Sequence, residues 1–219
     1  MIESDALVGK RTYGDPCGIA RALDVVGERW ALLVVRELLL GPKRFTDLRA
    51  GLPHVGPDVL SQRLRELEDT GVVQRGKLPP PAGSRVYELT ERGRELEPVI
   101  LGLGRWGSRA PLPAEPGELG IDALMLALKT LYDPVRADPL IDTSFELQLG
   151  DQRFEVRPTE EGLAVERGEA PYALATITTD PGTLQQVLWH GRRLHDAPLT
   201  IAGDRRSGEQ FLTLFPLPK

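Results

Sequence analysis

The sequence predicts an α+β protein of two domains, each with its own hydrophobic core. Its 219 residues exceed the usual size of one small domain. Apolar residues recur at helical spacing through most of the first half, whereas alternating, strand-like patterns are frequent in the second. Residues 110–117 include three prolines, which fix φ and remove amide donors. We therefore expect domains at residues 1–110 and 118–219, joined by a Pro-rich linker at 111–117.

The composition is that of an ordinary folded protein, with 41% apolar and 27% charged residues. No apolar run approaches the length of a membrane span, and the N-terminus has early acidic residues instead of a signal-peptide pattern. We therefore expect a cytoplasmic protein without a membrane partner. Cys17 is the one cysteine, which excludes an intrachain disulfide.

The net charge of −5 is unevenly distributed. Residues 1–110 hold 17 Lys or Arg against 15 Asp or Glu, whereas residues 111–219 hold 10 against 17. Because contact with phosphates depends on local basic groups, the near-neutral first half remains compatible with nucleic-acid binding.

Four helices are predicted at the start of the chain. Ile19–Val26 and Glu28–Leu40 have helix-period apolar positions, and Gly41 and the proline after it end the second helix. Phe45–Gly51 forms a short helix before a turn. Pro57–Thr70 forms the fourth, because proline suits the first position of a helix and the glycine at 71 suits its end.

The fourth helix has two distinct faces. Leu60, Leu64 and Leu67 share one face and should pack inward. Serine, glutamine and arginine side chains, which read base edges in DNA, lie opposite. The residues of this polar face are Asp58, Ser61, Gln62, Arg65 and Asp69.

A β-hairpin should follow, because Val72–Leu78 and Arg85–Leu89 alternate around the Pro-rich tip 79–84. Lys77 and Arg85 flank this tip, and one long helix then starts at residues 90–93 and runs past Trp106. An isolated helix with one polar face would indicate only a solvated surface. Helices followed by a basic hairpin, in this order, are instead typical of a winged helix-turn-helix that places one helix in the major groove.

The first half resembles the HxlR family of winged-helix transcriptional regulators. The resemblance is carried by Cys17–Gly18, Gly27–Trp30, Arg36–Leu38, Gly41–Pro42, Arg44–Leu48, Val59–Leu67 and Tyr87–Leu96. It implies a homodimer, formed by Ile19–Val26 and Leu96–Trp106, that binds double-stranded DNA at a roughly palindromic operator. We expect a sequence-specific regulator, and a repressor in preference to an activator. The expected DNA contacts are Arg44, Pro57, Asp58, Ser61, Gln62, Arg65, Lys77 and Arg85.

In part of this family a cysteine near the start of the domain senses oxidants or electrophiles, and Cys17 occupies that neighbourhood. The start of a helix lowers a thiol pKa, which favours such a redox sensor. The alternative is that Cys17 is a small buried apolar residue.

The second half resembles the sterol carrier protein 2 (SCP2) type of domain, a smaller-sheet α/β fold that lines an apolar cavity. The resemblance lies mainly in Ala175–Asp180, Thr183–Trp189, Leu199–Asp204 and Gln210–Phe215, whereas His195–Pro198 departs from the usual glycine-rich turn. It implies a ligand-responsive protein with a hydrophobic small-molecule effector. The alternative is a domain that only braces the dimer. The candidate wall residues, which equally suit a plain core, are Leu124, Leu128, Leu131, Leu188 and Trp189.

An enzyme is not expected, because the three histidines, His54, His190 and His195, form no catalytic or zinc motif. No phosphate-binding or dinucleotide-binding glycine pattern occurs in the sequence, so we expect no catalytic residue, metal or cofactor. The rival function is a winged protein-interaction module without specific DNA binding. Gln62, Arg65 and Arg85 favour DNA, because a protein-binding surface more often presents apolar anchors.

Overall fold

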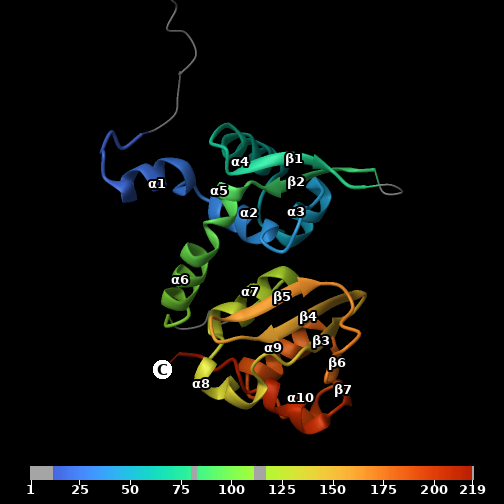
Figure 1. Cartoon of the computed structure of the whole chain (residues 1–219). Coiled ribbons are helices and arrows are strands. Elements are labelled where there is room, and N and C mark those ends of the chain that lie inside the picture. Colours follow the sequence, from blue (N-terminus) through green and yellow to red (C-terminus); the bar gives the residue numbers. More distant parts are fainter. Residues whose placement is uncertain (1–11, 80–82, 111–116, 219) are drawn as a thin grey trace, which may run out of the picture. The chain divides into compact units, whose positions relative to one another are not determined.

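The computed structural model describes residues 12–79, 83–110 and 117–218. The linker expected at 111–117, apart from Gly117, and the centre of the Pro-rich tip lie outside the described residues. The chain forms two compact units (Figure 1). Unit 1 runs up to Leu38 and from Pro42 to Arg94, and unit 2 comprises Leu39–Gly41 and the chain from Glu95 onward.

Unit 1 contains helices followed by a two-stranded hairpin, as the sequence predicts. The bounds predicted for the third helix and the second strand are confirmed as residues 45–51 and 85–89, and each of the other bounds differs by at most three residues. The elements are α1 (Gly18–Val26), α2 (Ala31–Leu38), α3 (Phe45–Gly51), α4 (Pro57–Asp69), β1 (Val73–Lys77), β2 (Arg85–Leu89) and α5 (Glu91–Arg94).

The helix predicted at Glu28–Leu40 starts late because of Trp30. This residue has a φ of +78°, which a right-handed helix does not contain. The carbonyl of Trp30 still accepts the amide of Val34, at 2.9 Å, and α2 begins at Ala31.

The leucine face of α4 is confirmed as part of the core of unit 1. Leu60, Leu64 and Leu67 are at most 1% exposed. Val34, Val35 and Leu38 of α2, Leu48 of α3 and Val86 of β2 are also buried. Burial of this face fixes the rotation of α4, so that the polar residues point outward.

The hairpin has a third, very short partner that the sequence did not predict. β1 and β2 are antiparallel, and Lys77 lies opposite Arg85. The Lys43 amide donates to the Tyr87 carbonyl at 2.9 Å, and the Tyr87 amide donates to the Lys43 carbonyl at 2.8 Å. The chain entering α3 is thereby joined to the outer side of β2.

The prediction of one long helix after the hairpin is wrong. The chain forms α5 (Glu91–Arg94) and then α6 (Glu97–Gly107). Pro98 explains the break, because it has no amide to donate and its ring would clash with the carbonyl of Arg94, four residues earlier, in a continuous helix. Proline is tolerated in the first turn of a helix, where Pro98 lies.

Unit 2 contains a five-stranded sheet in the order β5-β4-β3-β6-β7. β3 and β6 are parallel, and the other neighbouring strands are antiparallel. Besides α6, its elements are α7 (Ile121–Leu131), α8 (Pro134–Ala137), η1 (Asp138–Leu140), β3 (Phe145–Leu149), β4 (Gln152–Pro158), β5 (Leu163–Arg167), β6 (Ala175–Thr179), α9 (Pro181–Trp189), η2 (Leu194–Asp196), β7 (Thr200–Gly203) and α10 (Arg205–Phe211).

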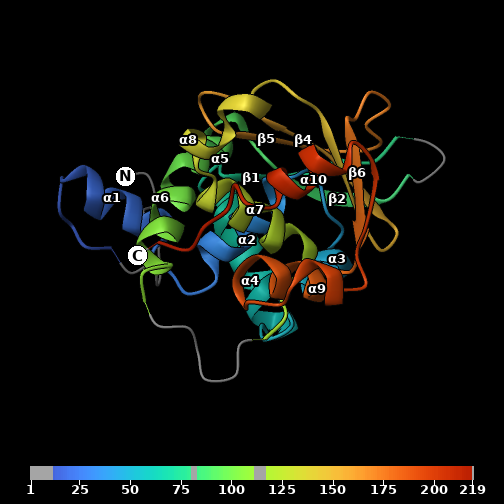
Figure 2. The ribbon, with the colours of Figure 1, turned by 90° about the horizontal axis from the view of Figure 1, so that it is seen from below.

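The core of unit 2 lies between one face of this sheet and its helices (Figure 2). Phe145, Leu147 and Leu149 alternate along β3 and are fully buried on that face. They form one cluster with residues of α7, α9 and α10. Phe145 stacks on Phe211 of α10, with ring centroids 4.6 Å apart.

The helix α6 packs on α7 within unit 2. Glu97 forms an ion pair with Lys129, and the Arg105 Nε donates to the carbonyl of Thr130 at 3.1 Å. A Cβ atom on Gly104 would lie 3.0 Å from the Thr130 side chain, so glycine permits the close approach. Of the helices in the described part of the chain, none is long and apolar enough to cross a membrane.

Candidate nucleic-acid interface

The N-terminal end of α4 is accessible for contact with an anion. Pro57 is the first helical residue, and Gly56 before it has no side chain that could cap the first-turn amides. The residues from Gly56 to Val59 are all exposed. The positive end of the helix dipole favours a phosphate there. Asp58 lies in this same first turn, and its carboxylate would have to point away from such a phosphate because the two negative charges repel.

The predicted reading face of α4 is solvent-accessible. Asp58, Gln62, Arg65 and Asp69 are exposed, and Ser61 is half-buried. The Gln62 amide donates to Glu66 Oε1 at 3.0 Å, and the Arg65 Nε makes a long contact of 3.4 Å with the carbonyl of Ser61. Glu66 thus holds the Gln62 side chain along the helix. Both side chains project from one rigid element, as base readout requires.

The other arginine of α4, Arg63, has a different role. It is 7% exposed and forms ion pairs with Glu66 and, at 3.7 Å, with Glu28. Since both carboxylates neutralise its charge inside unit 1, Arg63 ties α4 to the turn before α2. It is a structural residue and not a reader.

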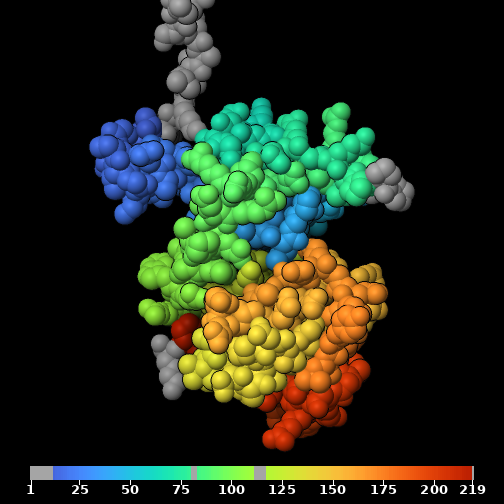
Figure 3. Space-filling model, viewed as in Figure 1, coloured from blue at the N-terminus to red at the C-terminus, as the bar shows by residue number. Residues whose placement is uncertain are grey.

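Basic side chains lie on the elements that precede and follow α4 in the chain. Figure 3 shows the surface of the molecule coloured by residue number. Arg44 is exposed at the start of α3, where its amide donates to Asp47 Oδ2 at 3.0 Å. Lys77 and Arg85 are exposed and directly opposite each other at the outer end of the hairpin. In contrast, Arg75 is paired with Glu68 and lies over the ring of Tyr87. Arg44, Lys77 and Arg85 are accessible and form none of these ion pairs, whereas the charge of the exposed Arg75 is already paired.

Two features of this surface were missed by sequence reasoning. Arg49 of α3 is also exposed, and its position on a short helix carried no signal. Glu37 is 1% exposed and accepts from Arg36 at 2.8 Å and from Lys43 at 2.5 Å. A buried carboxylate between two cations fixes the start of the segment that contains Arg44.

Cys17 lies at the start of α1 and is exposed. Hydrogen bonds from the backbone amides of Ala20 and Ile19 lower the pKa of its thiol below the ordinary value. The alternative of a small buried residue does not describe this position.

The residues expected to line a ligand cavity belong to the packed interior of unit 2. Leu124, Leu128 and Leu131 are buried in the core of unit 2, and Leu188 and Trp189 pack against it. The Trp189 indole donates to the carbonyl of Phe215 at 3.0 Å. A pocket in the described part of unit 2 is lined instead by polar residues around α9.

A buried leucine face, an accessible polar face and a basic hairpin together define a helix-turn-helix DNA-binding domain with a wing. Comparison with known proteins agrees. The chain belongs to the HxlR-like helix-turn-helix family, whose sequence profile matches residues 25–113. It is a DNA-binding transcriptional regulator of this type.

Two relatives from Bacillus subtilis (strain 168) illustrate the similarity. The uncharacterized HTH-type transcriptional regulator YvaP is 39% identical over 88 residues, which are 40% of this chain and 82% of YvaP. The HTH-type transcriptional regulator YodB is 34% identical over 97 residues, which are 44% of this chain and 84% of YodB. The crystal structure of quinone-bound YodB is 30% identical, covers 42% of this chain and 97% of that one, and gives a TM-score of 0.37. These relatives are named regulators, not enzymes.

Proposed function

We propose that this protein is a homodimeric, sequence-specific repressor that places α4 in the major groove of a roughly palindromic operator. The observation that supports this most directly is the accessible face with Gln62 and Arg65, on a helix whose leucines fix its orientation. Arg44, Lys77 and Arg85 would contact phosphates and so set the position of the helix. Pro57 and Asp58, at the start of α4, would lie nearest the sugar-phosphate backbone of the DNA.

Exposed apolar side chains support the homodimer. On α1, Ile19 is 73% exposed and Leu23 lies one turn further. On α6, Val99, Leu103 and Trp106 are likewise exposed at helical spacing. A second copy of the chain would cover these residues, and two-fold symmetry would place the two half-sites roughly 34 Å apart.

The proposal is tested by titrating DNA from upstream of the protein's own gene, labelled for fluorescence anisotropy, at one stated salt concentration. The control is the same DNA with a scrambled sequence. We expect nanomolar binding and at least about a thousandfold preference for the native sequence. Equal, weak binding of both DNAs would instead support the protein-interaction module.

Lys77→Ala tests the role of the wing. Because a phosphate contact carries no sequence information, this change should weaken binding to native and scrambled DNA alike and reduce the slope of log Kd against log salt by about one. Lys77→Arg keeps the charge and is the matched control. A loss confined to the native sequence would show that Lys77 contacts a base.

A second candidate function, response to oxidants or electrophiles, is favoured by the exposure of Cys17 and its lowered thiol pKa. We propose that modification of this thiol releases the operator. Cys17→Ser should then remain bound to DNA in diamide or methylglyoxal, whereas the unchanged protein should dissociate.

The lowered pKa predicts the pH dependence of thiol reactivity. The thiolate is the reactive form, so alkylation by iodoacetamide should reach half its maximal rate at a lower pH than in a cysteine peptide. Every alkylation event reports Cys17, because the chain has no other cysteine. The urea-unfolded protein is the control and should behave like the peptide. A half-maximal pH equal to that of the unfolded protein would remove the support for a sensor.

For unit 2 we propose an SCP2-like domain that binds a hydrophobic small-molecule effector. The support is architectural, since a five-stranded sheet has its helices packed on one apolar face. Leu124, Leu128, Leu131, Leu188 and Trp189 line that apolar interior, which would have to open for a ligand. Release of operator DNA by oleate, but not by an equal concentration of acetate, would support this effector class.

A further inference from the structure

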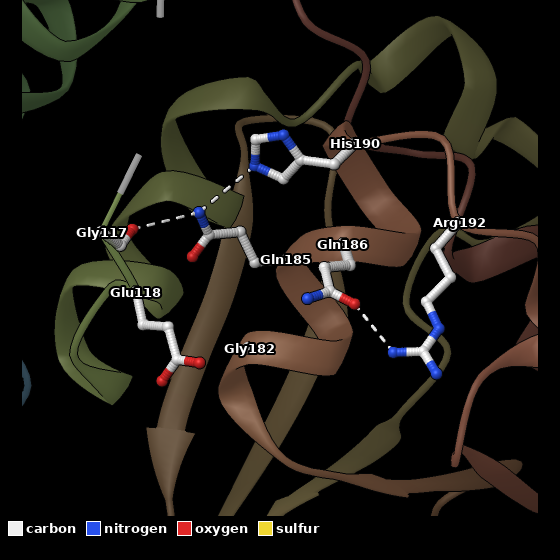
Figure 4. A pocket seen from close by; sticks show the side chains of 7 residues that line it. All are labelled: Gly117, Glu118, Gly182, Gln185, Gln186, His190 and Arg192. Carbon is white, nitrogen blue, oxygen red and sulfur yellow. Dashed lines mark hydrogen bonds between the residues drawn. The ribbon is translucent and has the colours of Figure 1, made fainter. Parts of the chain in front are cut away.

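A pocket of about 430 Å³, lined by polar residues and glycines, lies in unit 2 on the side of α9 (Figure 4). Its volume is in the range of small-molecule sites. It is separate from the apolar core, because none of its lining residues belongs to the core cluster. These lining residues are Gly117, Glu118, Gly182, Gln185, Gln186, His190 and Arg192.

One end of this pocket is acidic. A Cβ atom on Gly182 would lie 2.8 Å from Glu118 Oε1, so the glycine leaves room for the carboxylate beside the first turn of α9. Asp180 already accepts from the Thr183 amide at 2.8 Å and adds a second negative charge at this end of the helix. The two carboxylates outweigh the partial positive charge of the helix N-terminus, so this end favours a cation over an anion.

The other end is basic. Arg192 donates to Gln186 Oε1 at 2.7 Å (Figure 4). It also donates to the carbonyl of Asp196 at 3.0 Å. Both acceptors are neutral, so these contacts orient the guanidinium and leave its positive charge uncompensated. His190 lies at the same end of α9, where its ring meets the Gln185 amide at 3.3 Å. A half-buried, oriented guanidinium favours a carboxylate.

The middle of the pocket can form hydrogen bonds. Gln185 Oε1 accepts from the amide of Leu119 at 3.1 Å, and its amide group lies 3.5 Å from the carbonyl of Gly117. Gln186 is exposed and adds a second carboxamide. The two charged ends are therefore joined by neutral polar groups that suit an amide or a hydrated chain.

We propose that this pocket binds a small zwitterion, with its ammonium group at Glu118 and its carboxylate at Arg192. Gly182 and Gln186 are four positions apart on α9, which separates the two ends by about 6 Å along the helix axis. This distance suits an ω-amino acid or a dipeptide better than a free α-amino acid, whose two charged groups lie close together.

The test is a titration of the ¹⁵N-labelled full-length protein with 6-aminohexanoate, followed by the side-chain signals of Gln185, Gln186 and Arg192. Hexanoate and hexylamine, each lacking one charged group, are the matched probes. We expect shifts at these signals with a Kd on the order of 1 mM. Each single-charge probe should bind about fivefold more weakly or worse. Equal binding of hexanoate, or no shift at about twenty times the expected Kd, overturns the proposal.

Two variants locate the charges. Arg192→Gln should abolish the difference between 6-aminohexanoate and hexylamine, and Glu118→Gln should abolish the difference from hexanoate. Arg193→Gln is the matched control, because Arg193 is the next residue but pairs with Asp196 and is outside the lining. If Arg192→Gln disturbs the fold, the exposed Glu118 still provides the test. Unchanged selectivity in Glu118→Gln also overturns the proposal. The experiment contains no DNA, so its result is independent of operator binding.

Discussion

Replacement of Arg65 by alanine should weaken binding of the specific operator by about 1 to 3 kcal/mol, with little change in binding to scrambled DNA. The Arg65 side chain is exposed on the polar face of α4, and its hydrogen bond to the carbonyl of Ser61 is long, at 3.4 Å. The guanidinium therefore loses only a weak hydrogen bond when it moves to contact a base edge. Gln62→Ala should have an effect of similar size, reduced by the contact with Glu66 that Gln62 would have to exchange.

Both variants are to be measured by fluorescence anisotropy at the same salt concentration, with native and scrambled DNA in parallel. Arg157→Ala, an exposed arginine on β4 of unit 2, is the control for loss of one positive charge. An equal loss on native and scrambled DNA would assign Arg65 to the phosphate contacts and remove it from base readout.

Gly93→Ala should lower the free energy of unfolding of unit 1 by about 3 kcal/mol. A Cβ atom on Gly93 would lie 2.2 Å from the carbonyl oxygen of Val72, which is backbone and cannot rotate away. The same junction contains Thr90, whose hydroxyl donates to the carbonyl of Gly71 at 2.7 Å and accepts the amide of Gly93 at 3.1 Å. The methyl group would therefore separate α5 from the start of β1.

Urea unfolding followed by circular dichroism measures this effect. Gly102→Ala is the matched control, because a Cβ atom there meets nothing within 4 Å and alanine favours the helix α6 by about 0.5 to 1 kcal/mol. Gly93→Ala with the stability of the unchanged protein would mean that the α5–β1 junction can move apart without cost.

The sequence predicted what depends on local spacing. The leucines of α4 recur every three or four residues, and this pattern alone located both the buried face and the exposed polar face. Pro98 also indicates the break between α5 and α6, but the helical spacing of apolar residues on both sides of it led to the prediction of one continuous helix. The bridge between Lys43 and Tyr87 could not be predicted, because two residues far apart in the chain form it through backbone groups.

The pocket in unit 2 shows a second limit of sequence patterns. Glu118 and Arg192 belong to segments more than 70 residues apart, and exposed polar residues have no periodicity that would group them. Leu124 and Leu128 show the converse difficulty. A leucine that lines a cavity and a leucine in a packed core have the same spacing, and only the tertiary structure distinguishes them.

Because α6 packs on α7, the boundary of the family profile and the boundary of the compact units fall at different places in the chain. The HxlR-like profile runs to residue 113 and so includes α6, yet the helix forms its ion pair and its close glycine contact with α7 of unit 2. A segment starting at residue 118 could not be transplanted onto another regulator as a finished part. Such a segment would lack α6, and the other regulator would have to provide a helix with a glycine at the position where Gly104 packs against Thr130.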